Sequence, residues 1–219
     1  MDDKLRINIV MMITTAACIF FAIMPFSGFL IYPITLFVTY VHEMCHALVA
    51  ILTGGSVDRI TIHADGSGVT WTRGGIQWMV NFAGYLGTVL IGLFSIHLIK
   101  TGFNARIVLS VFLAIMGLSV VFTGFHDMFG TIWGLIIGLC LFFVITNFRQ
   151  GIAEFVATFI SIQLLLNAFY DLRVLFFLSG TGVHTDAMNM ANETGIPSIF
   201  WACLWIGISV YTTYRVLFK

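Results

Sequence analysis

Long apolar runs separated by short polar stretches dominate this sequence. Each run is close to the about 20 residues that a helix needs to cross a bilayer. Seven such runs cover residues of about 8–29, 31–53, 78–99, 105–124, 127–146, 152–178 and 197–217. The pattern therefore predicts an all-α polytopic membrane protein with about seven transmembrane helices. We expect residues 1–219 to form a single integral membrane domain, with the lipid bilayer as its surroundings.

The one sizeable polar loop covers residues 56–77. Polar and apolar residues alternate over 59–63 and again over 69–72, and Asp65-Gly66-Ser67-Gly68 between them is typical of a turn. This pattern predicts a β-hairpin. A free strand edge in this hairpin could hold an extended peptide by backbone hydrogen bonds. The alternative interpretation is a plain connection between two helices.

Composition narrows the class further. The chain is 59% hydrophobic and only 9% charged, with a formal net charge of +0, so neither a separate soluble domain nor a nucleic-acid partner is expected. The four cysteines lie in apolar runs without Cys-x-x-Cys spacing, which favours a packing role over disulfides or a thiolate metal site.

Three glycines, Gly130, Gly134 and Gly138, recur every four residues in the fifth run. Such spacing lets two membrane helices approach closely. We interpret it as packing inside the bundle, with a homodimer face as the second interpretation, so the pattern does not determine the oligomeric state.

The pattern with most chemical content is His42-Glu43-Met44-Cys45-His46, within the second apolar run. Positions i and i+4 lie on one face of a helix, so His42 and His46 can present both imidazoles to one zinc ion. Glu43 is then placed to act as the general base that takes a proton from the attacking water. Ionisable groups inside a membrane are costly, and this favours a functional role for all three residues.

A zinc site with two histidines needs a third protein ligand, commonly a carboxylate. In the sixth run Gln163, Asn167 and Asp171 recur every four residues and form one polar stripe. If spans alternate in direction, Asp171 lies about 10 Å below the same membrane surface as the histidines, at 1.5 Å per residue. We therefore predict Asp171 as the third ligand and Asn167 as a residue that orients it or holds a substrate carbonyl.

Two other residues remain open as third ligand. Asp186 is the first alternative, because a loop can enter a cavity, although Thr185 or Asp186 could instead cap a short helix that ends near Gly195. His126 is the second, although its position beside Asp127 is typical of a solvated turn. The polar stripe itself could also be a hydrogen-bond network without metal.

Several stretches that follow the His-Glu-x-x-His pattern resemble, together with it, a known family. Together with residues 42–47, the stretches Leu52–Gly55, Asp65–Thr70 and Ala83–Gly87 resemble the site-2 protease-type intramembrane metallopeptidases, in particular their small peptidase-like branch. Tyr170-Asp171 and Thr185-Asp186-Ala187 also fit that branch. The stretch 167–172 lacks the proline and the glycine that accompany the third ligand in proteolytic members, so Asp171 and Asp186 both stay open.

The resemblance implies a zinc enzyme that hydrolyses peptide bonds of membrane-spanning protein substrates near the cytoplasmic face. Counting alternating spans puts Lys4 and Arg6 on the hairpin side, and a positively charged N-terminus favours the cytoplasm. We therefore expect a cytoplasmic N-terminus and a cytoplasm-facing active site. The alternatives are a catalytically inactive pseudo-peptidase that binds client helices and, because no internal repeat is visible, less readily a small transporter.

Overall fold

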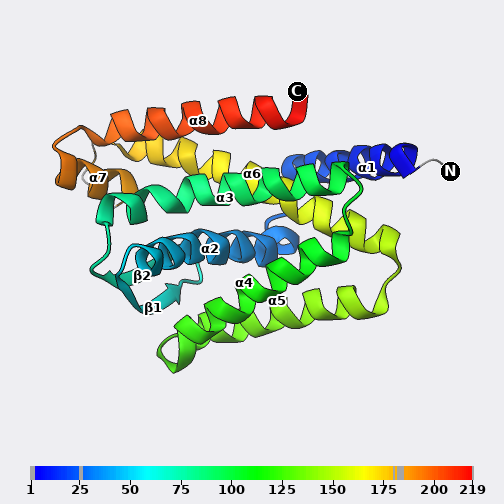
Figure 1. Cartoon of the computed structure of the whole chain (residues 1–219), viewed down its shortest axis with the longest axis horizontal. Coiled ribbons are helices and arrows are strands. Elements are labelled where there is room, and N and C mark those ends of the chain that lie inside the picture. Colours follow the sequence, from blue (N-terminus) through cyan, green and yellow to red (C-terminus); the bar gives the residue numbers. More distant parts are fainter. Residues whose placement is uncertain (1–2, 25–26, 180, 182–184, 219) are drawn as a thin grey trace.

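The computed structural model describes residues 3–24, 27–179, 181 and 185–218, which form a helical bundle with a small hairpin (Figure 1). The helices are α1 (Asp3–Ile23), α2 (Ser27–Leu52), α3 (Gln77–Lys100), α4 (Ala105–Thr123), α5 (Met128–Asn147), α6 (Gln150–Leu178), α7 (Asp186–Thr194) and α8 (Ser198–Phe218), with a 3₁₀ turn, η1 (Gly124–His126). The strands are β1 (Ser56–Ile62) and β2 (Gly68–Arg73), which pair antiparallel. The predicted helical class and hairpin are confirmed.

Five helices among the described residues, α2 to α6, are long and apolar enough to cross a membrane. The seven spans of the sequence pattern are not confirmed. Within the described part of α1 the apolar stretch, Leu5–Phe21, is shorter than the about 20 residues that a span needs. The second half of α8 carries four polar or charged residues, which lower its hydropathy: Ser209, Thr212, Thr213 and Arg215.

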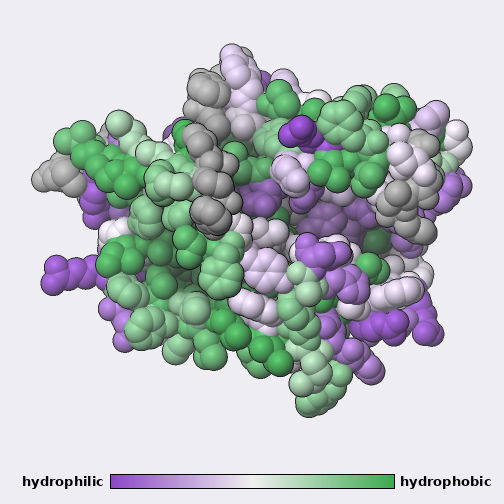
Figure 2. All heavy atoms as spheres, turned by 180° about the vertical axis from the view of Figure 1, so that it is seen from behind, coloured by the Kyte–Doolittle hydropathy of each residue, from purple (hydrophilic) through white to green (hydrophobic). Residues whose placement is uncertain are grey.

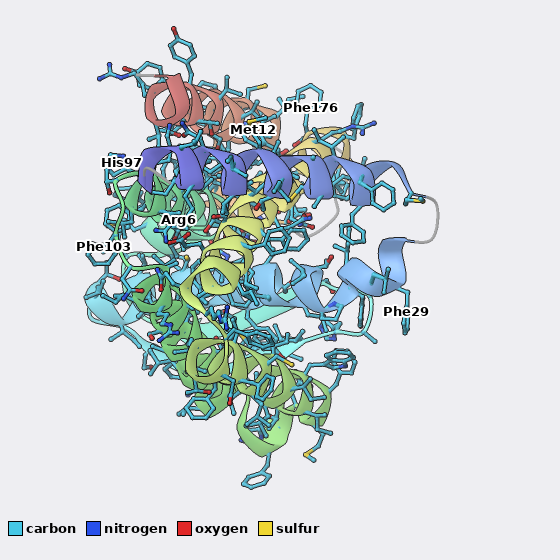
Figure 3. All side chains as sticks on the ribbon, turned by 90° about the vertical axis from the view of Figure 1, so that its right-hand side faces the viewer. Arg6, Met12, Phe29, His97, Phe103 and Phe176 are labelled. Atoms are coloured by element: carbon cyan, nitrogen blue, oxygen red, sulfur yellow. The ribbon has the colours of Figure 1, made fainter. Side chains whose placement is uncertain are left out.

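The N-terminal helix lies elsewhere than the alternating-span count predicts. Arg6 Nη2 lies 3.0 Å from Glu154 Oε1, near the start of α6, whereas the hairpin lies at the end of the bundle where α6 finishes (Figure 1). Helix α1 runs across this opposite end of the bundle (Figure 3). The placement of Arg6 on the hairpin side is therefore wrong. A cytoplasm-facing site stays a prediction that rests on the resemblance.

Helix α2, which carries the His-Glu-x-x-His pattern, is the most enclosed of the five spans. Within the most apolar stretch of α2, 61% is buried inside the bundle, whereas in α5 the buried share is 22%. Its fully buried side chains include Phe37, Tyr40 and Met44, and Phe37 packs edge-on against Phe112 of α4 with ring centroids 5.4 Å apart. The bundle is thus assembled around the helix that holds the candidate ligands.

The hairpin is fixed to the bundle by side chains that bond to it near its turn. The backbone N–H of Ile62 donates to Asp127 Oδ2 at 2.6 Å, while Asp127 Oδ1 caps α5 by accepting from the N–H of Gly130 at 2.9 Å. On the other side Thr39 Oγ1, from α2, donates to the carbonyl of Gly66 at 2.6 Å. These bonds hold β2 over the face of α2 that carries the histidines.

The glycine stripe of α5 is used inside the bundle, as predicted. A Cβ on Gly134 would lie 2.6 Å from Val120 of α4, and Tyr40 of α2 donates its hydroxyl to the carbonyl of Gly130. Gly138 faces Leu113 across the same contact. The absence of side chains here lets α5 approach both neighbours closely.

The outer surface agrees with a membrane environment. In Figure 2 apolar residues cover most of the part of the molecule away from the hairpin, and hydrophilic residues gather most densely on the side where the hairpin lies. Large apolar side chains such as Met12 (72% exposed) and Phe29 (88% exposed) point outward (Figure 3). Such an apolar exterior needs lipid or another apolar partner. It indicates an integral membrane protein.

Candidate metal centre and active site

A cavity of about 400 Å³ opens between the hairpin and the helices α2, α3, α6 and α7. His42, Glu43 and His46 line it from one side of α2 because a helix brings i and i+4 onto one face. Glu43 is 4% exposed and His46 is 6% exposed. The structure thus brings these three residues together on one wall of the cavity.

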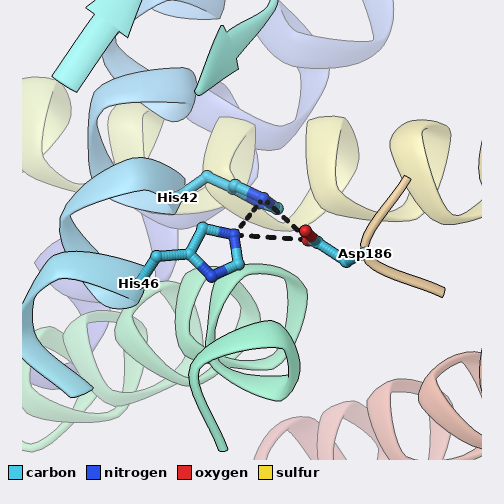
Figure 4. Close-up of side chains that lie close together, drawn as sticks. All are labelled: His42, His46 and Asp186. Carbon is cyan, nitrogen blue, oxygen red and sulfur yellow. Dashed lines mark hydrogen bonds and ion pairs between the residues drawn. The ribbon is translucent and has the colours of Figure 1, made fainter. Parts of the chain in front are cut away.

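Three ligand atoms meet in this cavity (Figure 4). His42 Nε2 and His46 Nε2 lie 3.0 Å apart, and Asp186 Oδ2 lies 3.3 Å from the first and 3.2 Å from the second. The two imidazoles come from α2, and the carboxylate reaches them from the first residue of α7. Of the described residues, only these form a group of three or more ligands close enough to hold a metal ion.

The geometry of this group fits a tetrahedral ion. Zinc bonds of about 2.0–2.1 Å would separate tetrahedral ligand atoms by roughly 3.3 Å, close to the observed distances. Asp186 Oδ2 is buried and has no partner with hydrogen-bond geometry, although both imidazoles lie within ion-pair distance. Lone pairs that converge in a buried space repel one another unless a cation lies between them. The donor set therefore fits a divalent metal ion, with three protein ligands and one open position.

His46 is held in the tautomer that metal binding requires. Its Nδ1 lies 2.6 Å from the main-chain carbonyl oxygen of Val80, on α3. A carbonyl can only accept, so Nδ1 carries the hydrogen and Nε2 is left with a lone pair that points into the cavity. An outer hydrogen bond of this kind fixes the ring and strengthens the ligand.

Asp186 is presented by a helix whose ends are well defined. Thr185 caps α7 by accepting from the N–H of Met188 at 3.2 Å, and Gly195 ends the helix in the left-handed conformation. Thr185 is thus the cap, which leaves the Asp186 carboxylate free for the cavity. Burial raises the pKa of the Asp186 carboxyl, but the adjacent imidazoles of His46 and His42 outweigh this effect and hold its pKa well below the usual range. This direction favours the ionised form, which is the form that binds a metal ion.

The structure brings Asp186, not Asp171, to the histidines. Asp171 lines the same cavity from α6 but is not part of the three-ligand group. Depth and periodicity correctly placed Asp171 at this level. They could not show that Asp186, at the start of α7, comes within 3.2–3.3 Å of both imidazoles. His126 lies in η1 and does not line the cavity.

Asn167 does not line the cavity either. Its side-chain Nδ2 donates to the main-chain oxygen of Gln163 at 2.9 Å and to Gln163 Oε1 at 3.3 Å, within the same helix. The polar stripe of α6 is therefore satisfied locally over this turn. We expected Asn167 to orient the third ligand or to hold a substrate carbonyl. Its position outside the cavity and its bonds to Gln163 do not support a direct role in substrate binding.

The side of the cavity formed by α3 is shaped by a glycine. A Cβ on Gly84 would lie 2.5 Å from the Nε2 atoms of both His42 and His46, so only glycine leaves the ligand atoms free. The next residue, Tyr85, packs edge-on against His42 with ring centroids 4.7 Å apart. Gly84 belongs to the stretch Ala83–Gly87 that carries the family resemblance, and here it makes room for the ligand atoms.

Sequence reasoning assigned no part in the site to several residues that line or support the cavity. These are Thr70 on β2, Val80, Asn81 and Gly84 on α3, and Glu193 on α7. Asn81 Nδ2 donates to Glu193 Oε1 at 3.4 Å, which ties α7 to α3. The only available signal was the position of Thr70 and Gly84 in stretches that carry the family resemblance.

A comparison with protein-family models decides what this arrangement belongs to. The model described as Peptidase M50B-like matches residues 12–216. The chain belongs to the Peptidase M50B-like family. This confirms the resemblance to site-2 protease-type proteins and indicates an intramembrane metallopeptidase. No curated protein and no solved structure matches the chain.

Proposed function

We propose that this M50B-like protein is a zinc-dependent intramembrane endopeptidase that cleaves membrane-spanning proteins. One observation carries the proposal: the Nε2 atoms of His42 and His46 converge with Asp186 Oδ2 in a cavity that Glu43 also lines. Two imidazoles, one carboxylate and an open position are the ligand set of catalytic zinc. Glu43 is not part of the ligand group and is therefore free for proton transfer.

The residues of the chain have separate tasks in the proposed reaction. A bound zinc ion would supply Lewis acidity towards the scissile carbonyl and the attacking water. Glu43 takes a proton from that water and delivers it to the amine that leaves when the C–N bond breaks. His42, His46 and Asp186 hold the metal, and Val80 and Gly84 keep the ligand atoms correctly oriented and unobstructed.

The hairpin offers a means of holding the substrate. Among the described residues the sheet has two strands, so β2 has a strand neighbour on one side only. Residues 66–70 and 72 line the cavity along that strand. A helical peptide bond is hidden within its own helix, so a substrate span must unwind before cleavage. An extended segment could then pair with β2 by backbone hydrogen bonds.

Replacing the base tests the proposal. The protein is reconstituted in liposomes with a single-span model substrate, and cleavage and bound zinc are measured for wild type and Glu43→Gln. We expect the variant to lose cleavage by at least about 10³-fold while it retains zinc, because the proton acceptor is gone and the ligands remain. Chelation should stop wild-type cleavage, and added zinc should restore it.

The same experiment separates the enzyme from the pseudo-peptidase interpretation. A protein that binds zinc and captures the substrate, yet yields no product with any of several single-span substrates, would be a client-binding protein. Undiminished turnover in Glu43→Gln would reject the proposed role of the base. Loss of zinc in that variant would show that Glu43 acts on the metal site instead.

A further inference from the structure

The base is in contact with the hairpin through Thr70. Side chains alternate along β2, so Thr70 shares one partly buried side with Gly68 and Thr72, while Val69 and Trp71 are the more exposed residues of the strand. Thr70 Oγ1 lies 2.7 Å from Glu43 Oε2 and 3.0 Å from the main-chain oxygen of Glu43. One hydroxyl thus has two acceptors on the same residue.

Gly68 is the second residue of β2 that contacts the Glu43 side chain. A Cβ at this position would lie 2.7 Å from Glu43 Oε1 and 2.8 Å from Glu43 Cγ. The strand therefore passes so close to Glu43 that a side chain at Gly68 would displace the base. One carboxylate oxygen faces the glycine backbone, and the other meets the hydroxyl of Thr70. Two alternate residues of β2 together fix the position of Glu43.

We propose that Thr70 is a positioning residue for Glu43, so that the hairpin belongs to the catalytic machinery as well as to the substrate site. This inference rests on the proposed function, in which Glu43 is the base. A threonine side chain is stiff about χ1, and a hydrogen bond from it fixes the carboxylate more firmly than packing alone would.

The Thr70 hydroxyl can donate either to Glu43 Oε2 or to the Glu43 main-chain oxygen, and these two arrangements suit the ionised and the protonated form of Glu43. While Glu43 is ionised, the Thr70 hydroxyl donates to Oε2. Once Glu43 has taken the proton of water, its own O–H can donate to Thr70 Oγ1, and the Thr70 hydrogen turns to the main-chain oxygen at 3.0 Å. The proton then passes from Glu43 to the leaving amine and the first arrangement returns. In both arrangements the Thr70 hydroxyl keeps an acceptor on Glu43.

The variants Thr70→Val and Thr70→Ser test this role in the full-length reconstituted protein. Valine keeps the shape and removes the hydroxyl, whereas serine keeps the hydroxyl. We expect Thr70→Val to lower kcat by about 10–100-fold, the cost of a misplaced catalytic group, with KM within about threefold of wild type and zinc content unchanged. Thr70→Ser should restore kcat to within about threefold.

Thr61→Val is the matched control. Thr61 lies on β1, pairs with Val69 in the same hairpin and does not line the cavity. Its replacement removes a threonine hydroxyl from the same element without touching Glu43, so we expect wild-type kcat. A loss in Thr61→Val equal to that in Thr70→Val would overturn the proposal, because the effect would then belong to the hairpin as a whole. Loss of zinc in Thr70→Val would also overturn it.

Infrared difference spectra give a readout that does not depend on cleavage. Subtracting the spectrum of Glu43→Gln from that of wild type isolates the carboxylate band of Glu43. We expect the band to shift in Thr70→Val and to stay in place in Thr70→Ser. A shifted band in a protein that cleaves nothing would uphold the contact and reject the proposed function. An unshifted band together with wild-type kcat in Thr70→Val would reject the positioning role.

Discussion

The two sides of the cavity differ in how firmly they hold their functional groups. On the side of α2 and the hairpin, His46 is fixed by Val80, and the hairpin is bonded to Asp127 and to α2. On the side of α6 and α7, Asp186 is carried by a helix of 9 residues. That helix is held by one long hydrogen bond, from Asn81 to Glu193, and by two buried side chains of its own, Ala187 and Met190.

One side of the cavity therefore preorganises the two histidines and the base, and the other side completes the metal site with the third ligand. The histidines and the base are set by the folding of the central helix, whereas the third ligand arrives only when α7 docks. Metal affinity should therefore respond to changes on both sides, but for different reasons. On the first side a change removes or blocks a ligand. On the second it alters how often the carboxylate is in place.

The largest effect is expected from the firmly held side. His46→Ala removes a ligand outright, so zinc affinity should fall by more than about 100-fold, beyond the 10–100-fold that the loss of an outer hydrogen bond costs. Bound zinc per protein, measured by mass spectrometry after dialysis, checks this. Circular dichroism should remain that of wild type. A full zinc complement in this variant would remove His46 from the ligand set.

Gly84→Ala tests whether the ligands need the open space on α3. The added Cβ would lie 2.5 Å from both Nε2 atoms, so the imidazoles must turn away from the ion position. We expect zinc affinity to fall by about 10–100-fold, as for a disturbed outer shell. Gly117→Ala is the matched control, because a Cβ there has no atom within 4 Å. Equal zinc binding by both variants would contradict the steric argument.

Changes to the contact that docks α7 should have a smaller effect. Asn81→Ala and Glu193→Ala each remove one hydrogen bond, worth about 1 kcal/mol, so each should weaken zinc binding by roughly fivefold. In the double variant the two losses should not add, since both act through the same bond. Zinc titration of the three variants checks this. Fully additive losses would mean that the two residues act independently.

The smallest effect is expected at the solvent side of the hairpin. Arg73 Nε lies 2.7 Å from Asp58 Oδ2, and the Arg73 side chain is 78% exposed. Such exposed ion pairs contribute about 0.2–1 kcal/mol. Arg73→Ala should therefore leave zinc content and cleavage within about twofold of wild type. A large loss of cleavage would show that the hairpin depends on this surface pair and not on its contacts with Glu43 and Asp127.

Local patterns allowed the α2 part of the site to be predicted from the sequence. His42, Glu43 and His46 belong to one helix, and their common face follows from helical geometry alone. The hairpin, the glycine packing of α5 and the short capped helix before Gly195 were predicted for the same reason, since each depends on neighbouring residues.

Contacts between distant elements were not predictable in this way. Asp171 and Asp186 lie at the same end of the bundle, and only the packing of α7 against α3 decides which reaches the histidines. The count of seven spans is not confirmed, and the alternating directions were wrong for α1, because Arg6 pairs with Glu154 near the start of α6. Neither the length nor the hydropathy of an apolar run reports its direction.

The zinc content of Asp186→Ala and Asp171→Ala, measured side by side after dialysis, tests the central claim most directly. The two variants remove the same group from two walls of one cavity, so each is the control for the other. We predict that Asp186→Ala loses most of its zinc and that Asp171→Ala keeps nearly all of it. Zinc lost from Asp171→Ala and retained by Asp186→Ala would contradict the assigned ligand set.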